Sequence, residues 1–230
     1  VKVGTSVLSR EGGGLDEARV ARIAAEVASA CARGVRVALV TSGAIGAGVK
    51  DLGLKRRPDA LPALQAAAAV GQGRLMHLYA AAFARHGLKM GQILLTAEDL
   101  ADRTRYLNIR NTLGALHDLG AVPVSNENDT VAVEEITFGD NDRLAAVLAL
   151  LIPADLLVLL TSVAGLLDPK TGVRIPEVGE VTAAVRALAT EAHSEGGRGG
   201  MASKILAADT AARAGIPVIV APGAERDVLV

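Results

Sequence analysis

The chain has 230 residues, of which 50% are hydrophobic and 2% aromatic, and its formal net charge is −1. This length suits one large domain or two small ones, and so few aromatic residues without a basic stripe give no support for a nucleic-acid partner. No apolar run reaches the roughly 18 residues of a membrane span, and the single cysteine, Cys31, favours a reducing cytoplasm over a disulfide-forming compartment.

Apolar runs typical of strands alternate with helical patterns along the chain. Each run is short, rich in Leu or β-branched residues and bounded by Gly or polar residues, and the expected strands are 35–40, 91–95, 121–124, 155–160 and 216–220. The expected helices are 15–32, 61–86, 103–119, 142–151 and 201–214. This alternation predicts an α/β fold, in which a largely parallel sheet carries helices on both faces.

Small hydroxyl, glycine or acidic residues follow four of the strands, counting a first strand that ends before Gly4. They are 4–6 (Gly-Thr-Ser), 41–44 (Thr-Ser-Gly-Ala), 125–129 (Ser-Asn-Glu-Asn-Asp) and 161–162 (Thr-Ser). The carboxyl ends of parallel strands meet at one edge of a sheet, and ligands bind there. We therefore expect a binding site at this edge.

The segments 126–129 (Asn-Glu-Asn-Asp) and 139–142 (Gly-Asp-Asn-Asp) concentrate carboxylates and carboxamides beside strongly apolar runs. One such segment alone would indicate a turn, because Asn, Asp and Gly are the common turn residues. Two of them, with lysines in glycine-rich loops near both ends of the chain, indicate a site that grips a small polar molecule and organises a metal or a phosphate.

Two lysines lie beside glycines in a way that suits phosphate binding. Lys2 precedes Gly4 and two hydroxyl residues, which can offer a cation and backbone N–H groups to phosphate oxygens, although an exposed strand lysine is the more ordinary explanation for this segment alone. Lys204 follows Gly199 and Gly200 in the first turn of an expected helix. A cation there opposes the helix dipole, and such a local conflict indicates a functional lysine.

The stretch 41–48 (Thr-Ser-Gly-Ala-Ile-Gly-Ala-Gly) reads as a strand end, a tight turn and a helix start. Its small residues suit either a ligand at the helix N-terminus or close packing of the helix on the sheet. Two cationic glycine loops and an acidic centre are the parts of a phosphoryl-transfer site. The usual nucleotide-loop motifs are absent from the sequence, and the histidines and the one cysteine show no metal-ligand spacing.

In order and spacing, segments 2–6, 41–44, 126–129, 139–142 and 199–204 resemble the glutamate 5-kinase branch of the amino acid kinase family across almost the whole chain. The resemblance implies one kinase domain over residues 1–230, an αβα three-layer sandwich around a mainly parallel eight-stranded sheet. It implies transfer of the γ-phosphoryl group of ATP, with Mg²⁺ bridging the phosphates, to the side-chain carboxylate of L-glutamate. This reaction begins proline biosynthesis, proline commonly inhibits it, and members often form homo-oligomers.

The resemblance also implies roles for individual residues. Lys2 and Lys204 would neutralise the phosphoryl group in flight, and Asp142 would hold both ammonium groups. Ser42, Asp129 and Asn141 would bind glutamate, with the carboxylate on its α-ammonium and the hydroxyl and amide donors on its carboxylates. No residue is assigned as a metal ligand. The ATP site would be formed by Lys2, Thr161, Ser162, Arg198, Gly199, Gly200, Met201, Ala202, Ser203 and Lys204.

The chain departs from the pattern of this family at two nucleotide-site positions. Ser162 stands where members commonly have Asp, and Arg198 stands where they commonly have Thr, which bears on nucleotide contacts rather than on the reaction. The sequence begins without Met and stops before the last elements of that kinase domain. We therefore expect further residues at both ends of the natural protein. Many bacterial members of the family also carry a small C-terminal domain, and whether one follows here is left open by the sequence.

Two other functions remain open. A sibling kinase could act on acetylglutamate, carbamate, aspartate or a nucleoside monophosphate, but segment 125–142 offers acids and amides rather than arginines for a phosphate, which favours an amino acid. A catalytically silent sensor of glutamate or proline would need no phosphoryl-stabilising set, and Lys2, Asp142 and Lys204 are all present.

Overall fold

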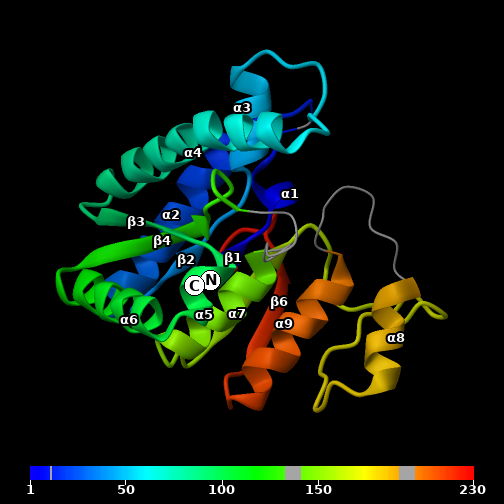
Figure 1. Cartoon of the computed structure of the whole chain (residues 1–230). Coiled ribbons are helices and arrows are strands. Elements are labelled where there is room, and N and C mark those ends of the chain that lie inside the picture. The colour runs from blue at the N-terminus through cyan, green and yellow to red at the C-terminus, as the bar shows by residue number, and fades with distance from the viewer. Residues whose placement is uncertain (11, 133–140, 192–199) are drawn as a thin grey trace.

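The computed structural model describes residues 1–10, 12–132, 141–191 and 200–230 and is built around a parallel sheet (Figure 1). Its described strands are β1 (Lys2–Val3), β2 (Leu39–Val40), β3 (Lys89–Leu95), β4 (Ala121–Glu127), β5 (Leu157–Thr161) and β6 (Val218–Pro222). Within these ranges the six strands are all parallel and lie in the order β3-β4-β2-β1-β5-β6.

The short strand β1 lies where the chain changes from one half of the sheet to the other. Lys2 is in register with Val40 of β2 on one side and with Leu159 of β5 on the other. The chain completes the β2 side first and then crosses by helix α7 (Asn141–Leu151) to β5. Ligands of open parallel sheets bind at such a switch point, so the topology brings Lys2 and the N-terminus of α7 to the expected place for a site.

Helices cover both faces of the sheet. α2 (Glu17–Ala32) and α4 (Leu61–Ala84) pack on one face, and α6 (Arg103–Asp118), α7 and α9 (Met201–Arg213) pack on the other (Figure 1). Successive residues of β5 divide between the two cores: Val158 and Leu160 contact the α2 and α4 side, and Leu157 and Leu159 contact the α7 and α9 side. The predicted α/β fold with helices on both faces is confirmed.

The shorter helices are α1 (Thr5–Leu8), α3 (Ala44–Asp51), α5 (Ala97–Ala101) and α8 (Ala183–Glu191). α3 and α4 approach each other at backbone distance, since a Cβ on Gly48 would lie 1.7 Å from the carbonyl oxygen of Ala67, and one on Gly71 would lie 1.8 Å from that of Ala44. Close packing, one of the two interpretations of segment 41–48, therefore explains Gly48, with helix α4 rather than the sheet as its partner.

Several element ends differ from the predicted ones because pairing partners decide them. β2 covers Leu39–Val40 rather than 35–40, since these two residues are the ones in register with β4 and Val35 is 51% exposed. β4 extends past 124 to Glu127 because these residues stay in register with β3. The helices α1, α5 and α8 were not predicted. The described residues contain six strands, so the count of eight remains an expectation.

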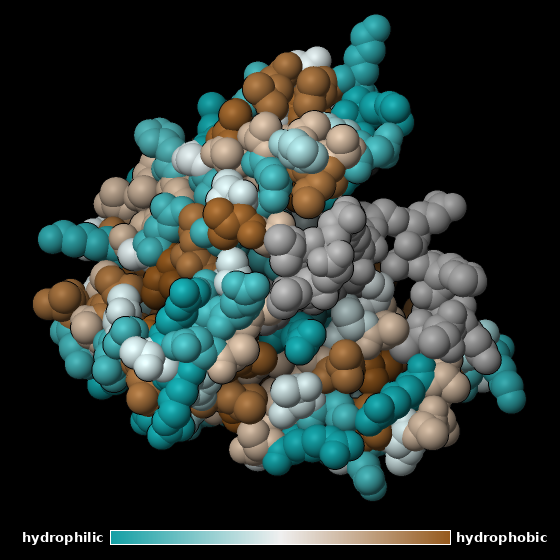
Figure 2. Space-filling model, in the orientation of Figure 1, coloured by the Kyte–Doolittle hydropathy of each residue, from teal (hydrophilic) through white to brown (hydrophobic). Residues whose placement is uncertain are grey.

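The face in Figure 2 mixes hydrophilic and hydrophobic residues, with apolar surface gathered over α3 and α4. Exposed large apolar residues from this part of the chain include Leu52, Leu54 and Val70. Among the helices in the described ranges, none combines the length and apolar character needed to cross a membrane.

Candidate active site

Three charged side chains from distant parts of the sequence meet at the carboxyl edge of the sheet. The carboxylate of Asp142 lies 2.6 Å from Lys2 Nζ through Oδ1 and 2.9 Å from Lys204 Nζ through Oδ2. Asp142 is fully buried, and Lys2 and Lys204 are only 3% and 6% exposed. We call these three residues the charge cluster. Charged side chains are tolerated in a protein interior when they are paired in this way.

The secondary structure explains the position of each member of the charge cluster. Lys2 lies on the central strand β1, and Asp142 lies in the first turn of α7, where the helix dipole favours a carboxylate. Lys204 lies in the first turn of α9, where the dipole disfavours a cation, and Asp142 offsets that cost. Ser203 Oγ is 3.1 Å from Asp142 Oδ2 and 3.0 Å from the carbonyl oxygen of Gly200.

The charge cluster is suited to stabilising a developing negative charge. A lysine ammonium has three N–H donors and can bind more than one acceptor at once. Two ammonium groups fixed by one carboxylate are preorganised donors, and such groups are worth most in a site from which water is excluded. The arrangement therefore fits an anionic group that passes between Lys2 and Lys204.

Beside the charge cluster lies a chain of neutral polar side chains, which we call the amide network. Asn141 Nδ2 lies 2.8 Å from the carbonyl oxygen of Thr41, 2.9 Å from Ser42 Oγ and 2.9 Å from Asn126 Oδ1. Asn126 Nδ2 donates in turn to Gln72 Oε1 at 2.8 Å. Ser42, Gln72 and Asn126 are all at least nine-tenths buried. The segment directly after β2 thus joins α4, β4 and α7 in one continuous network.

A buried tyrosine supports the strand end that carries the network. Thr41 Oγ1 donates to the hydroxyl of Tyr79 on α4 at 3.2 Å, and both side chains are fully buried. Burial raises the pKa of Tyr79 to about 12, and the hydrogen bond from Thr41 acts in the opposite direction. Tyr79 also stacks on Phe83 with ring centroids 6.2 Å apart, so α4 holds residue 41 through a rigid aromatic pair.

The remaining predicted site residues lie at the same edge with different exposures. Asp129 is half-buried in the turn directly after β4. Thr161 ends β5 and is buried, whereas Ser162 is exposed. Gly200 is the N-cap of α9 and makes no side-chain cap, so the first N–H groups of α9 are placed for an anion. Arg198, Gly199 and the segment 139–140 lie outside the described residues.

Two residues predicted for the nucleotide site have other surroundings. Met201 is buried against Leu166 and Ile205 in a small apolar core, and Ala202 is exposed on the first turn of α9. Met201 thus anchors the start of the helix, and its position in the ATP site remains a prediction. Among the described residues, no group of three or more His, Cys, Asp or Glu is placed to hold a metal ion.

Sequence reasoning missed Gln72 and Tyr79. Both lie on α4, whose many alanines hide the pattern of a buried face. A signal does exist, because a glutamine and a tyrosine seven residues apart fall on one side of a helix, in line with Leu64, Ala68 and Leu75. A polar residue in the middle of a buried helix face is expected to have a hydrogen-bond partner.

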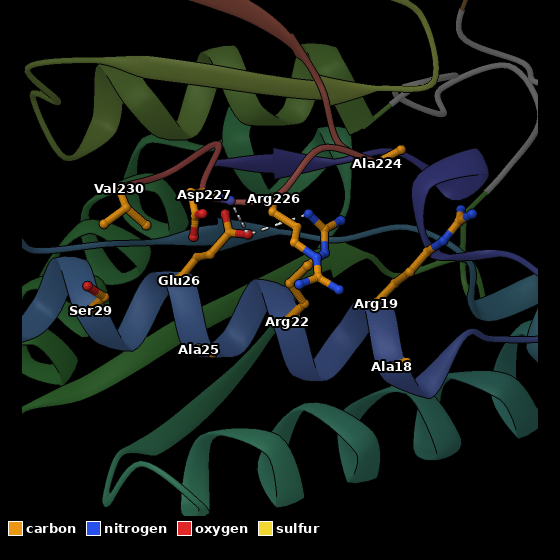
Figure 3. Close-up of a pocket in the computed structure, with 10 residues that line it drawn as sticks. All are labelled: Ala18, Arg19, Arg22, Ala25, Glu26, Ser29, Ala224, Arg226, Asp227 and Val230. Atoms are coloured by element: carbon orange, nitrogen blue, oxygen red, sulfur yellow. Dashed lines mark hydrogen bonds and ion pairs between the residues drawn. The ribbon is translucent and has the colours of Figure 1, made fainter.

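The structure also has a cavity away from the candidate active site, and none of the described site residues lines it. A cavity of about 570 Å³ lies between α2 and the segment after β6 (Figure 3). In it, Glu26 accepts hydrogen bonds from the backbone N–H groups of Asp227 and Leu229, both at 3.2 Å, and lies 3.4 Å from Arg22 Nη1. Arg22 also donates to the carbonyl oxygen of Gly223. Arg22 and Glu26 thus fasten the segment after β6 to α2.

Comparison with known sequences identifies relatives of this chain. The model described as "Amino acid kinase family" matches residues 1–222. A glutamate 5-kinase from Moorella thermoacetica is 53% identical over 97% of this chain and 60% of its own length, and one from Burkholderia cenocepacia is 50% identical over 100% of this chain and 63% of its own length. The chain thus spans about three fifths of the length of these curated relatives.

Solved structures share the fold at low sequence identity. The carbamate kinase from Giardia lamblia bound to AMP-PNP superposes with a TM-score of 0.64 at 17% identity, covering 97% of this chain and 90% of its own. The N-acetylglutamate synthase from Neisseria gonorrhoeae complexed with coenzyme A and N-acetyl-glutamate gives 0.64 at 18% identity, with coverages of 97% and 53%. At these identities the likeness concerns the fold alone.

Proposed function

This chain belongs to the amino acid kinase family, and within it we propose that the protein is a glutamate 5-kinase, which transfers the γ-phosphoryl group of ATP to the side-chain carboxylate of L-glutamate. The product is L-glutamyl 5-phosphate, the first intermediate of proline biosynthesis. The observation that carries the proposal is that Asn141 and Asp142, adjacent residues of α7, join the amide network to the charge cluster. The groups proposed to bind the polar acceptor and the groups proposed to stabilise the transferred phosphoryl group are thus held by two consecutive residues.

In the proposed mechanism Lys2 and Lys204 stabilise the charge that spreads over the transferred group. Asp142 takes no proton and instead fixes the two ammonium groups on either side of the path. Phosphoryl transfer needs mainly positioning and charge stabilisation, and a buried, prepaired set of lysines supplies both. Removal of one lysine therefore affects the chemical step more than substrate binding.

Glutamate would be bound at the amide network and the turn after β4. Asp129 offers a carboxylate to its α-ammonium, and Ser42 accepts from Asn141 and so keeps its hydroxyl hydrogen for a substrate carboxylate. ATP would lie across Thr161, Ser162 and the first turn of α9, with residues 198–204 around its phosphates. Mg²⁺ would shield the phosphates, and phosphate oxygens and water suit it as ligands where a protein offers few carboxylates.

Several broader features belong to the same proposal. We expect the natural protein to contain the eight-stranded kinase domain, to assemble as a homo-oligomer and to work in the cytoplasm, and we expect proline to inhibit it. A small C-terminal domain would occupy part of the length by which the curated relatives exceed this chain.

The test is ATP turnover by the protein at its natural length, with Mg²⁺ and one acceptor at a time. The panel contains glutamate, acetylglutamate, aspartate, carbamate and UMP, each with and without proline. Turnover with glutamate alone, suppressed by proline, is the expected result. Turnover with another acceptor would keep the phosphoryl site and overturn the acceptor assignment. Glutamate binding without turnover would identify a sensor.

A further inference from the structure

One carbonyl group fixes which way the amide network points. The carbonyl oxygen of Thr41 can only accept hydrogen bonds, and Asn141 Nδ2 lies 2.8 Å from it. The Asn141 amide must therefore direct its NH₂ group to Thr41, and its Oδ1 atom lies on the opposite side. The expected role of Asn141 as an amide donor to substrate thus changes, since its donors face Thr41, Ser42 and Asn126.

The direction set at Asn141 passes along the network. Asn126 presents Oδ1 to the Asn141 NH₂ group at 2.9 Å, so its own NH₂ group faces away from Asn141. That NH₂ group donates to Gln72 Oε1 at 2.8 Å. Gln72 is thus the acceptor at which the described network ends, and without it the Asn126 amide could rotate and present its NH₂ group to Asn141.

The two ends of the network carry polar atoms that no described residue satisfies. Asn141 Oδ1 and Gln72 Nε2 are both shielded from solvent and have no hydrogen-bond partner within the described ranges. A buried amide atom without a partner is costly and calls for an explanation. Asn141 Oδ1, beside the charge cluster, is an acceptor without a partner among the residues that the structure describes. A ligand that brings an N–H donor would satisfy it.

We propose that Gln72 is a positioning residue, which holds the Asn126 amide and thereby keeps the Asn141 carbonyl oxygen turned toward the ammonium group of the amino acid substrate. This inference rests on the proposed function and names how the same site selects its acceptor. If the Asn126 amide rotates, its NH₂ group faces the NH₂ group of Asn141, and the repulsion between the two opposes the hydrogen bond from Asn141 to Thr41. An Asn141 amide that turns in response would offer its NH₂ group to the substrate, and this group repels an ammonium. Gln72 itself need not touch the substrate, because it acts through Asn126 and Asn141.

The experiment compares Gln72→Met with wild type in the protein at its natural length. Methionine keeps the length of the side chain and removes its polar atoms. We measure kcat and KM for glutamate, KM for ATP, and the same constants for glutarate, which has both carboxylates and no ammonium. We expect the KM for glutamate to rise about tenfold, from one lost hydrogen bond in a buried network. The kcat and the KM for ATP stay within about twofold, as befits a loss of substrate positioning alone.

The decisive quantity is the preference for glutamate over glutarate. Because glutarate has no ammonium to lose, we expect its kcat/KM to change little and the preference to fall about tenfold in Gln72→Met. Gln72→Glu restores the preference, since a buried, protonated carboxyl offers an acceptor and a donor as the amide does. Gln92→Met, which makes the same exchange at an exposed residue of β3, leaves every constant unchanged.

Other outcomes separate this inference from the proposed function. An unchanged preference in Gln72→Met, or an equal loss for glutamate and glutarate, would show that Gln72 serves packing only. Gln72→Leu removes the same acceptor with a different shape and gives the same readout if Gln72→Met does not fold. Wild-type protein without glutamate-dependent turnover would contradict the proposed function, and this inference would fall with it.

Discussion

The charge cluster and the amide network are neighbours of opposite character. The first consists of full charges at 2.6 and 2.9 Å, and the second consists of neutral groups joined by hydrogen bonds of 2.8 and 2.9 Å. Both are largely buried, and both depend on the N-terminus of α7. Fixed charges suit a transferred group whose charge distribution changes during the reaction. Amides suit a substrate group that must be bound in one orientation.

The difference predicts that the two regions fail differently. Damage to the charge cluster should slow the chemical step, because we propose that its groups act on the transition state. Damage to the amide network should raise the KM for the acceptor, because we propose that its groups bind the acceptor. Three substitutions, beyond those at Gln72, test this division, and a fourth tests the stability contributed by Tyr79, which holds the residue beside the amide network.

The largest effect is expected for Lys204→Ala. Loss of one of two charge-stabilising donors should lower kcat about 10³-fold, while the Kd for glutamate measured by calorimetry stays within about twofold. Asp142 keeps its bond to Lys2, so we expect the fold to survive. Lys55→Ala, at an exposed lysine, is the control and should have wild-type kcat. A Lys204→Ala enzyme with near-normal turnover would remove Lys204 from the mechanism.

Gly71→Ala should disturb the amide network indirectly, by displacing the helix that carries Gln72. The new Cβ would lie 1.8 Å from the carbonyl oxygen of Ala44, so α4 must move away from α3 and carry Gln72 with it. We expect a loss of about 2–3 kcal/mol in the free energy of unfolding, typical of a severe clash in a core, and a raised KM for glutamate. Gly73→Ala, on the same helix with open space around it, should be neutral or slightly stabilising in urea unfolding. Equal behaviour of the two variants would contradict the helix contact.

Asp129→Ala tests the turn after β4. Without the carboxylate proposed for the α-ammonium, the KM for glutamate should rise about tenfold, as for one charged hydrogen bond, with kcat within about threefold. Asp129→Asn keeps the shape and should lie between the alanine variant and wild type. Steady-state kinetics with saturating ATP measure both. An unchanged KM would place Asp129 outside the acceptor pocket.

The smallest effect is expected for Tyr79→Phe, which removes the partner of Thr41. One lost buried hydrogen bond should cost about 1 kcal/mol of stability at neutral pH. The folded-state pKa of Tyr79 is raised to about 12, so the protonated form favours folding. Its contribution is complete below the unfolded pKa of about 10 and is lost as pH rises toward 12.

The loss of stability at alkaline pH gives a second test of the prediction for Tyr79. Urea unfolding between pH 9 and 12 should show wild type losing stability more steeply than Tyr79→Phe, while Tyr106→Phe, at a half-buried tyrosine of α6, follows wild type. Parallel curves for wild type and Tyr79→Phe would mean that the Tyr79 hydroxyl is not held in its buried position.

The charge cluster could be predicted from sequence and the amide network only in part. Lys204 conflicts with its own helix dipole, and Lys2 and Asp142 lie at ends of elements that parallel topology brings to one edge. These are local signals. Gln72 bonds to a residue 54 positions away and Tyr79 to one 38 positions away, and the direction of an amide depends on which partner is a carbonyl. No local pattern contains that information.

The length of β2 escaped prediction for a related reason. An apolar run favours a strand, but its register with the neighbouring strands decides which residues pair, and these are Leu39 and Val40. Segment 41–48 shows the same limit, because both of its interpretations require glycine, and only the position of α4 explains Gly48.

The sequence separation within the charge cluster has a consequence for biosynthesis. Lys2 precedes its partner Asp142 by 140 residues, and Lys204 follows Asp142 by a further 62 residues. Until the ribosome has released the start of α9, the nascent chain cannot assemble the pair of ammonium groups. Such non-local contacts also slow folding, because long loops must close first. A chain synthesised only as far as α7 therefore lacks the second ammonium group of the charge cluster, which joins Asp142 only when α9 packs against α7.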